Sequence, residues 1–256
     1  ITVPDLRVLN TRLDDSPLYY NIQTAIDNAD EGDTIHAWSG TYYENIEISD
    51  EITLKGNGTS TIINGTSGTA IEINDNDISI EDLLIISSEK GVFLNAANDI
   101  SISTVRFTGN EYAIYIEDSQ GALVDNSEFD LEDYGIYFTG SSSGATVEYN
   151  NFRNATESAI YQSESDENGG TSIHDNTFND CAIGWQSGSS SNTFSTNALK
   201  DNTYGVRLTG IESYNNMLDS NTFDDSIVAV YIYNTAHDNN LFNNEFSNYN
   251  CWGIPV

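Results

Sequence analysis

The chain carries a degenerate repeat of about 23 residues that runs from roughly residue 75 to its end. Each repeat contains a large apolar anchor, and successive anchors are 22, 23, 26, 21, 24 and 23 positions apart. Self-similarity at such a period indicates a solenoid, in which each repeat packs only against its neighbours. The anchors are Phe107, Phe129, Phe152, Phe178, Leu199, Phe223 and Phe246.

Two shorter signals accompany the anchors. An asparagine stands two positions before most of them, as in IHDNTF at 173–178, and we interpret this segment as one strand. About six positions after most anchors comes a second strand that opens with a small residue, such as GIYF at 135–138. Apolar and polar residues alternate, so one face of each strand would fill a core and the other would meet solvent. The asparagines are expected to stack as a ladder at a tight corner; they are Asn150, Asn176, Asn197, Asn221 and Asn244.

The segment before the repeats predicts a cap. In IQTAIDNA, at 22–29, the apolar residues fall on one helical face, and Asn21 is suited to N-cap the helix. A helix there would cover the apolar side chains and strand edges of the first coil. We expect one domain over 1–256, with an irregular extension and capping helix at 1–33 and coils at 34–256. The sequence ends inside a repeat, at CWGIPV, which predicts that the domain continues or that a partner covers its last coil.

The block GTYYENIEISDEITLKGNGTSTIING at 40–65, with the helix before it, resembles the start of right-handed parallel β-helix proteins of the pectin-lyase-like superfamily. The later N-x-F and G-I-Y segments resemble its generic coils, so the similarity spans about residues 20–256. The resemblance implies an all-β fold, a right-handed parallel β-helix with a short N-terminal capping helix, and the repeat predicts about nine or ten coils. It does not select an activity, because the superfamily includes lyases, hydrolases, esterases and non-catalytic surface proteins.

Charge and composition exclude several classes of function. The chain has 40 acidic and 8 basic residues, a formal net charge of −32. Such a surface repels nucleic acid and anionic membranes, so we expect no nucleic-acid partner. No run of 18 apolar residues is present, so we expect no membrane insertion. The acid excess fits a protein adapted to a salty medium, and we expect an extracellular or cell-surface location.

The two cysteines are expected to be unpaired. Cys181 and Cys251 stand at the start of the second strand in repeats that are three coils apart. At about 4.8 Å per coil their separation would be ~14 Å, whereas a disulfide requires Cα atoms within about 7 Å. We interpret both as small buried thiols.

Stacked repeats turn a recurring position into a surface column. Aromatic rings beside polar groups suit sugars, which pack their C–H faces on rings and hydrogen-bond at their edges. The alternative is structural, because tyrosine is a good strand residue and stacks on its neighbours across strands. The outward column of the second strand is read as Tyr115, Tyr137, Tyr161, Gly184, Arg207 and Tyr231, and all of these except Gly184 are predicted to bind carbohydrate.

Another outward column combines acids with bases. Glu128 and Asp130 flank an anchor at positions i and i+2, which places them about 7 Å apart on one strand face. Arg153 and Lys200 follow in later coils. A polysaccharide lyase needs a base such as Arg or Lys, and an inverting glycoside hydrolase needs two carboxylates ~6.5–9.5 Å apart. These four residues are the catalytic candidates, and exposed salt bridges are the alternative interpretation.

Calcium (Ca²⁺) is the ion that best suits this composition, although we expect no required cofactor. Short groups of oxygen ligands in turns or near glycines can hold a hard cation. The candidates are Asp75 and Asp77 in one turn, and Asp166 and Glu167 in another. The alternative is that both are solvated acidic turns.

Three functions remain open from the sequence. The favoured one is a non-catalytic extracellular β-helix module that binds polysaccharide or forms part of a cell-surface layer. The second is a polysaccharide lyase or glycoside hydrolase acting on a long glycan, which a groove holding a basic residue and two acids would favour. The third is a structural protein that self-associates through its open C-terminal coil, which a buried end-to-end contact would favour.

Overall fold

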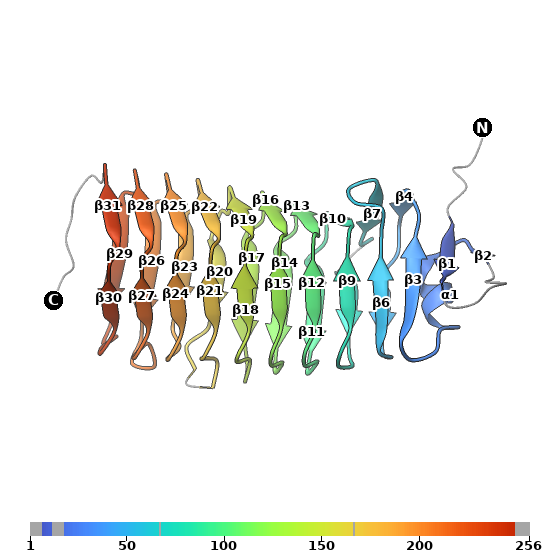
Figure 1. Ribbon diagram of the computed structural model, residues 1–256, viewed down its shortest axis with the longest axis horizontal. Helices are drawn as coiled ribbons and strands as arrows, with labels where there is room; N and C mark the ends of the chain where they lie inside the picture. The colour runs from blue at the N-terminus through green and yellow to red at the C-terminus, as the bar shows by residue number, and fades with distance from the viewer. Residues whose placement is uncertain (1–6, 12–17, 67, 166, 249–256) are drawn as a thin grey trace.

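The computed structural model describes residues 7–11, 18–66, 68–165 and 167–248. They form an elongated parallel β-solenoid whose coils each contribute one strand to each of three sheets (Figure 1). Nine complete coils run from β3–β5 to β27–β29, and β30 and β31 belong to a tenth. The expected all-β solenoid of about nine or ten coils is confirmed.

The sheets are named here in the order in which each coil visits them. The first sheet contains β2 (Leu18–Tyr19), β1 (Val8–Asn10), β3 (Asp33–Ala37), β6 (Ile52–Lys55), β9 (Ser79–Glu81), β12 (Ser101–Ser103), β15 (Leu123–Asp125), β18 (Thr146–Glu148), β21 (Ser172–His174), β24 (Thr193–Ser195), β27 (Met217–Asp219) and β30 (Asn240–Phe242). The second contains β4 (Gly40–Tyr42), β7 (Thr61–Asn64), β10 (Leu84–Ile86), β13 (Arg106–Thr108), β16 (Glu128–Asp130), β19 (Asn151–Arg153), β22 (Thr177–Asn179), β25 (Ala198–Lys200), β28 (Thr222–Asp224) and β31 (Glu245–Ser247). The third contains β5 (Ile46–Ile48), β8 (Thr69–Ile73), β11 (Lys90–Asn95), β14 (Tyr112–Glu117), β17 (Tyr134–Thr139), β20 (Ser158–Gln162), β23 (Ile183–Ser187), β26 (Tyr204–Thr209) and β29 (Val228–Tyr233).

The segment that was interpreted as one strand, I-x-x-N-x-F, is in fact two strands that meet at a corner. Ile173 lies in β21 and Phe178 in β22, and Asp175 between them has a φ of 56°. A positive φ turns the chain sharply, and aspartate and asparagine tolerate it better than most residues. Each coil therefore has three strands rather than the two expected.

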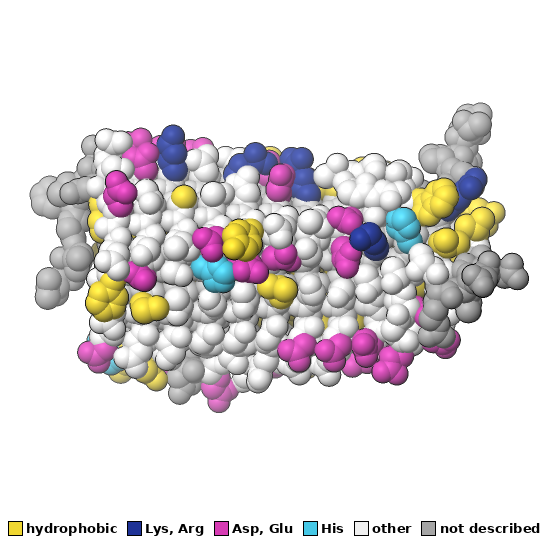
Figure 2. Space-filling view, viewed as in Figure 1, with side chains coloured by type: hydrophobic (Ala, Val, Ile, Leu, Met, Phe, Trp, Pro, Cys, Tyr) yellow, Lys and Arg dark blue, Asp and Glu magenta, His cyan; other side chains and the backbone are white. Residues whose placement is uncertain are grey.

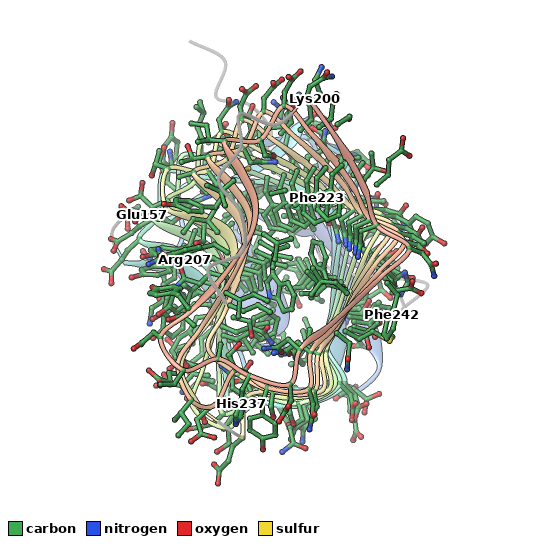
Figure 3. The ribbon with its side chains drawn as sticks, turned by 90° about the vertical axis from the view of Figure 1, so that its left-hand side faces the viewer. Glu157, Lys200, Arg207, Phe223, His237 and Phe242 are labelled. Carbon is green, nitrogen blue, oxygen red and sulfur yellow. The ribbon has the colours of Figure 1, made fainter. Side chains whose placement is uncertain are left out.

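The apolar anchors fill the interior, as expected. Phe107, Phe129, Phe152 and Phe178, called the inner stack, are at most 1% exposed. Their rings stack on one another with centroids 4.4–5.0 Å apart. Seen along the axis, the inward side chains pack between the three sheets, with Phe223 among them (Figure 3). The last anchor, Phe246, is 41% exposed because no described strand pairs with the far side of β31.

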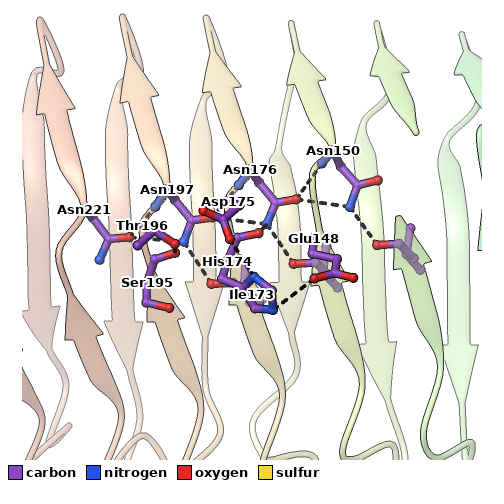
Figure 4. Close-up of polar contacts among 12 residues, drawn as sticks. Glu148, Asn150, Ile173, His174, Asp175, Asn176, Ser195, Thr196, Asn197 and Asn221 are labelled. Atoms are coloured by element: carbon purple, nitrogen blue, oxygen red, sulfur yellow. Dashed lines mark hydrogen bonds and ion pairs between the residues drawn. The ribbon is translucent and has the colours of Figure 1, made fainter. Parts of the chain in front are cut away.

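The predicted asparagine ladder occupies the corner between the first and second sheets (Figure 4). The backbone N–H of Asn150 donates a hydrogen bond to Oδ1 of Asn176 at 2.9 Å, and the side-chain nitrogen of Asn150 donates to the same oxygen at 3.1 Å. The Asn150 side chain also donates to the Val124 carbonyl at 2.8 Å. The same pattern continues from Asn176 through later coils, so each asparagine satisfies the buried backbone groups that the corner would otherwise leave unpaired.

The N-terminal cap is confirmed as helix α1 (Ile22–Ile26), which is shorter than the predicted 22–29. Asn21 caps it by accepting a hydrogen bond from the Thr24 amide at 2.8 Å. The Glu44 carboxylate accepts hydrogen bonds from the first two backbone amides of the helix. The preceding segment, expected to be irregular, instead contains β1 and β2, which extend the first sheet: β1 pairs antiparallel with β3, and β2 pairs antiparallel with β1.

Cys181 is a buried free thiol within the described residues, as expected. It lies at the corner before β23 rather than in a strand, and its amide donates to Oδ1 of Asn202 at 3.0 Å. Burial raises the pKa of the Cys181 thiol to about 12. Cys251 lies outside the described residues, so the absence of a disulfide between the two remains a prediction. Across the described ranges, no helix has the length and hydropathy that spanning a membrane requires.

Candidate glycan-binding face

The outer face of the third sheet carries a column of aromatic and polar side chains. Strand pairing brings Tyr115, Tyr137 and Tyr161 into register in β14, β17 and β20. Gln186, Arg207 and Tyr231 continue the same column in later coils. Four of the five predicted carbohydrate-binding residues are therefore tyrosines on one surface column, with Arg207 between the third and fourth of them.

Gly184 does not belong to this column, which corrects the predicted register. Gln186 pairs with both Tyr161 and Arg207, so it takes the position assigned to Gly184. Gly184 instead lies in the buried part of β23, where a Cβ atom would lie 2.6 Å from the Gly205 carbonyl. The motif of this coil is Gly-Trp-Gln, equivalent to Gly-Val-Arg at 205–207, rather than Ala-Ile-Gly.

A second aromatic column, which sequence reasoning missed, runs beside the first. Tyr112 and Tyr134 are the first residues of β14 and β17, and both are half-buried. Strict alternation would place Tyr112 inward, three positions before Tyr115. Two successive residues, Ala113 and Ile114, are buried between them, so both tyrosines point outward. The six-residue strands that begin with tyrosine carry the signal that could have revealed this column.

The two columns pack in a herringbone pattern. Tyr115, Tyr137 and Tyr161 stack with centroids 5.1 and 4.7 Å apart and ring planes within 15°. Tyr112 and Tyr134 stack likewise, 5.2 Å apart at 7°. Rings of different columns meet edge to face, as Tyr112 and Tyr137 do at 84°. Much of each ring face is therefore covered by its neighbour, and the surface presents mainly ring edges and phenol groups. We call this set the aromatic face; it comprises Phe93, Tyr112, Tyr115, Tyr134, Tyr137 and Tyr161.

The phenols of the aromatic face remain neutral over the physiological pH range. Burial, together with the negative charge of Glu111, raises the pKa of Tyr112 to about 12. Burial also raises the pKa of Tyr137 and of Tyr161. A neutral phenol can both donate and accept a hydrogen bond, so this surface can pair with hydroxyl groups that act as acceptors or as donors.

Basic side chains mark both ends of the aromatic face. Lys90 Nζ lies 4.0 Å from the ring centroids of Phe93 and Tyr115. Two coils beyond Tyr161 at the other end, the Arg207 guanidinium lies 5.0 Å from the centroid of the Tyr233 ring and donates a hydrogen bond to the Tyr233 hydroxyl. Although burial acts to raise it, the pKa of Tyr233 is lowered by hydrogen bonds to Thr209 and Arg207 and by the charge of Arg207. Arg207 and Glu157 project from this side of the solenoid (Figure 3).

The structure brings three of the four catalytic candidates together, on the outer face of the second sheet. Arg153 Nη2 lies 3.8 Å from Glu128 Oε2 and 3.5 Å from Asp130 Oδ2. Arg106 approaches the same two carboxylates at 3.7 and 3.8 Å. Both acids are thus shared between two arginines, the arrangement expected of a surface ion-pair network. Lys200 stands apart, two coils beyond Arg153, and contacts Asp201 at 3.9 Å.

The two calcium candidates lie in different parts of the solenoid. Asp75 and Asp77 occupy the turn between β8 and β9, where Asp75 accepts a hydrogen bond from the Asn76 amide at 2.8 Å. Glu167 belongs to the loop between β20 and β21 and accepts a hydrogen bond from the Ser141 hydroxyl. Asp166 lies outside the described residues. In the described ranges, no three His, Cys, Asp or Glu side chains converge as metal ligands.

The outer face of the first sheet differs in character. Figure 2 shows mostly uncharged polar side chains there, with acidic side chains gathered along the lower edge beneath β3 to β12. One of its histidines, His174, lies between two carboxylates: Nε2 is 3.4 Å from Glu148 and Nδ1 is 3.0 Å from Asp175 (Figure 4). A shallow polar depression of about 420 Å³ lies at the corner between the third and first sheets, and its lining includes Asn98 and Gly144.

Residues 46–199 match the sequence profile of the right-handed β-helix region, which is more than half of the chain. The chain belongs to the right-handed β-helix family. Part of this β-helix is also similar to a cell surface glycoprotein of Methanothermus fervidus, with 36% identity over 94 residues. That match covers 35% of this chain and 15% of the glycoprotein, so it concerns a small part of the longer protein.

Solved structures share the fold of this β-helix at low sequence identity. An alginate lyase from Paenibacillus sp. FPU-7 has a TM-score of 0.61 and 16% identity, over 89% of this chain and 96% of that one. A PL6 alginate lyase in complex with a trisaccharide has a TM-score of 0.73 and 12% identity, over 91% and 57%. The DFA-IIIase from Arthrobacter chlorophenolicus, in complex with DFA-III, has a TM-score of 0.70 and 14% identity, over 91% and 72%. At these identities the likeness concerns the pectin-lyase-like fold alone.

Proposed function

We propose that this β-helix is a non-catalytic extracellular or cell-surface module that binds polysaccharide along its aromatic face. The observation that carries the proposal is the regular column of half-buried tyrosines on the outer face of the third sheet, Tyr115, Tyr137 and Tyr161. Because the rings cover one another's faces, the phenol groups and ring edges make the contacts, hydrogen-bonding sugar hydroxyls at intervals of about one coil. Gln186, Arg207 and Tyr231 extend the contact surface toward the C-terminal coils.

The cell-surface part of the proposal is supported by the similarity to the Methanothermus fervidus cell surface glycoprotein. A glycan partner is consistent with fold neighbours that are described as complexes with a trisaccharide and with tetrasaccharides. Adaptation to a salty medium fits the net charge of −32. Self-association through β29, β30 and β31, which end the three sheets among the described strands, remains a separate prediction.

The test is affinity electrophoresis in gels that contain neutral, amino or uronate polysaccharides. The double variant Tyr137→Ala with Tyr161→Ala removes two adjacent members of the outer column and should lose the retardation that the wild-type protein shows. The matched control is Tyr43→Ala with Tyr149→Ala, because these tyrosines are 68% and 57% exposed and lie away from the aromatic face. Equal retardation of the folded Tyr137/Tyr161 variant and the wild type would place glycan binding elsewhere.

A second candidate function is a polysaccharide lyase or glycoside hydrolase centred on the second sheet. It is favoured by one observation: Glu128 and Asp130 both lie within 4 Å of a single Arg153 nitrogen, so two acids and a base share one surface. In a lyase, Arg153 would act near the proton to be abstracted, and in a hydrolase the two carboxyl groups would divide the acid and base roles.

This candidate predicts product formation that depends on the cluster. Incubation of the wild-type protein with the same polysaccharides should release unsaturated or reducing ends, and Glu128→Gln with Asp130→Asn should abolish the release. The ion-pair interpretation predicts no product from either protein. It also predicts that the double variant still migrates like the wild type in affinity gels.

A further inference from the structure

A column of acids borders the aromatic face where the strands of the third sheet begin. Glu89, Glu111, Asp133 and Glu157 immediately precede β11, β14, β17 and β20, and all four are exposed. Backbone hydrogen bonds keep successive coils in register here, such as that from the Glu157 amide to the Asp133 carbonyl at 3.1 Å. The four residues, called the acidic rim, therefore repeat with the strand spacing of about 4.8 Å, alongside the tyrosines.

The basic residues of this surface show how it holds a cation. Lys90 follows the first residue of the acidic rim, yet its ammonium group lies on the rings of Phe93 and Tyr115, each 4.0 Å away. Arg207 likewise contacts the Tyr233 ring and hydroxyl rather than a carboxylate of the described residues. Lys90 thus makes cation–π contacts at one end of the aromatic face, and Arg207 makes one two coils beyond the other end. Between them, Tyr134 stands near Glu157, Asp133 and Glu111. Within the described residues, no Lys or Arg makes a cation–π contact with the rings of Tyr134, Tyr137 or Tyr161.

We infer that the aromatic face takes a polysaccharide that bears amino groups, with the ammonium groups against the acidic rim and the sugar hydroxyls against the tyrosine phenols. This inference rests on the proposed glycan binding and specifies its substrate class. A net charge of −32 attracts a polycation and repels a polyuronate at long range. The acidic rim adds a local match, because carboxylates spaced by one coil can pair with amines along an extended chain.

The test is isothermal titration with three oligosaccharides of equal length: a β-1,4-linked glucosamine oligomer, its fully N-acetylated counterpart and an oligogalacturonate. The glucosamine oligomer should bind most tightly. Glu111→Gln with Asp133→Asn should weaken its binding about fivefold, as expected for two exposed ion pairs, and should leave the N-acetylated oligomer unaffected. Lys90→Met should strengthen binding of the glucosamine oligomer, because it removes a resident cation from two ring faces.

Asp50→Asn with Glu51→Gln is the matched control, since it makes the same charge change at two exposed residues in the turn between β5 and β6. Circular dichroism establishes that each variant is folded. A loss of affinity that is equal in the control and in the rim variant would show a non-specific attraction to the whole polyanion and would overturn the inference. Tighter binding of a lysine oligopeptide than of the glucosamine oligomer would also overturn it, in favour of a basic protein partner.

The outcomes separate this inference from the proposed function. If the N-acetylated oligomer binds as tightly as the amine and Tyr137→Ala with Tyr161→Ala abolishes both, the aromatic face binds glycan and the amino-sugar inference is wrong. If none of the three oligosaccharides binds, or binding ignores the tyrosine substitutions, the proposed function and the inference fail together.

Discussion

Two aromatic stacks run along this solenoid with almost the same geometry, and they face opposite environments. The inner stack, Phe107 to Phe178, has centroids 4.4–5.0 Å apart and is at most 1% exposed. The outer column, Tyr115 to Tyr161, has centroids 4.7 and 5.1 Å apart and is half-buried. Both spacings follow from strand pairing at about 4.8 Å, which places equivalent residues of successive coils directly over one another.

The difference between the stacks shows that ring stacking by itself does not assign a function. In the inner stack, four phenylalanines remove apolar surface from water and have no polar group to satisfy. In the outer column, each ring carries a phenol, and Tyr115 and Tyr161 stand near the acids Glu117 and Glu164. The same repeat geometry therefore stabilises the core in one place and presents an ordered array of hydrogen-bonding groups in the other.

The difference between the two stacks is tested most directly by removing one ring from each and comparing the loss of stability. Phe152→Ala should lower the free energy of unfolding by ~3–5 kcal/mol, because it opens a cavity in a closely packed interior. Tyr137→Ala should cost only about 1 kcal/mol, since it loses ring contacts at a surface that water can fill. Urea unfolding followed by circular dichroism measures both. Equal costs would mean that the outer column belongs to the core.

A buried acid, Glu132, stands at the corner between β16 of the inner stack and β17 of the outer column. Its carboxylate accepts a hydrogen bond from the Asn110 amide at 2.6 Å. Burial, opposed by the Asn110 hydrogen bonds and reinforced by Asp130 and Asp133, raises the pKa of Glu132 to about 8. The folded protein therefore binds a proton that the unfolded chain has already released above its ordinary pKa of 4.5.

This linkage predicts that stability falls as pH rises. Between about pH 5 and pH 8 the free energy of unfolding should decrease by up to ~1.4 kcal/mol per pH unit, and above the folded-state pKa it should level off. Glu132→Gln should remove this slope. Urea titrations at a series of pH values measure the slope, and parallel pH profiles for wild type and variant would assign the proton to another group.

The effect of salt on the melting temperature should also distinguish the two stacks, and it is the smallest of the effects predicted here. The net charge of −32 repels itself, and in ~1 M NaCl the screening length falls to about 3 Å, so the wild type should melt at a higher temperature. Glu111→Gln with Asp133→Asn should gain less from salt than the wild type, whereas Phe152→Ala should gain as much. The measurement is a series of melting curves at matched pH, with MgCl₂ and CaCl₂ at equal ionic strength as companions. A larger gain in calcium than in magnesium would support the Asp75 or Glu167 turns as ion sites.

Local sequence was sufficient for much of the architecture. The anchors at a regular period, such as Phe129 and Phe152, specify a stacked core because each coil can bury its apolar side chain only against the next. Asn176 could be placed at a corner because a short amide side chain is suited to pair with the exposed backbone of a turn. The helix at Ile22–Ile26 followed from its apolar face and its N-cap.

The errors arose where register depends on neighbouring coils. Gly184 lies two positions after the small residue Ala182, and Gln186 lies four positions after it. Only the strand pairing of Gln186 with Tyr161 and Arg207 shows that Gln186 is the one that faces outward. Tyr112 joined the aromatic face because two successive residues are buried after it, which period-two alternation does not anticipate. The third strand of each coil was hidden because the corner residue, such as Asp175, has a positive φ without being glycine.

What the sequence by itself determined is thus the repeat, the identity of the core residues, and the net charge of −32, from which we expect no nucleic-acid partner. Only the tertiary structure decided which polar side chains meet. Glu128 and Asp130 lie between Arg106 and Arg153 because three coils align them across strands, although 47 positions separate the two arginines in sequence. The acidic rim and the aromatic face become one surface for the same reason: stacking turns residues that are about one repeat apart into neighbours, and those contacts exist only once the coils are wound.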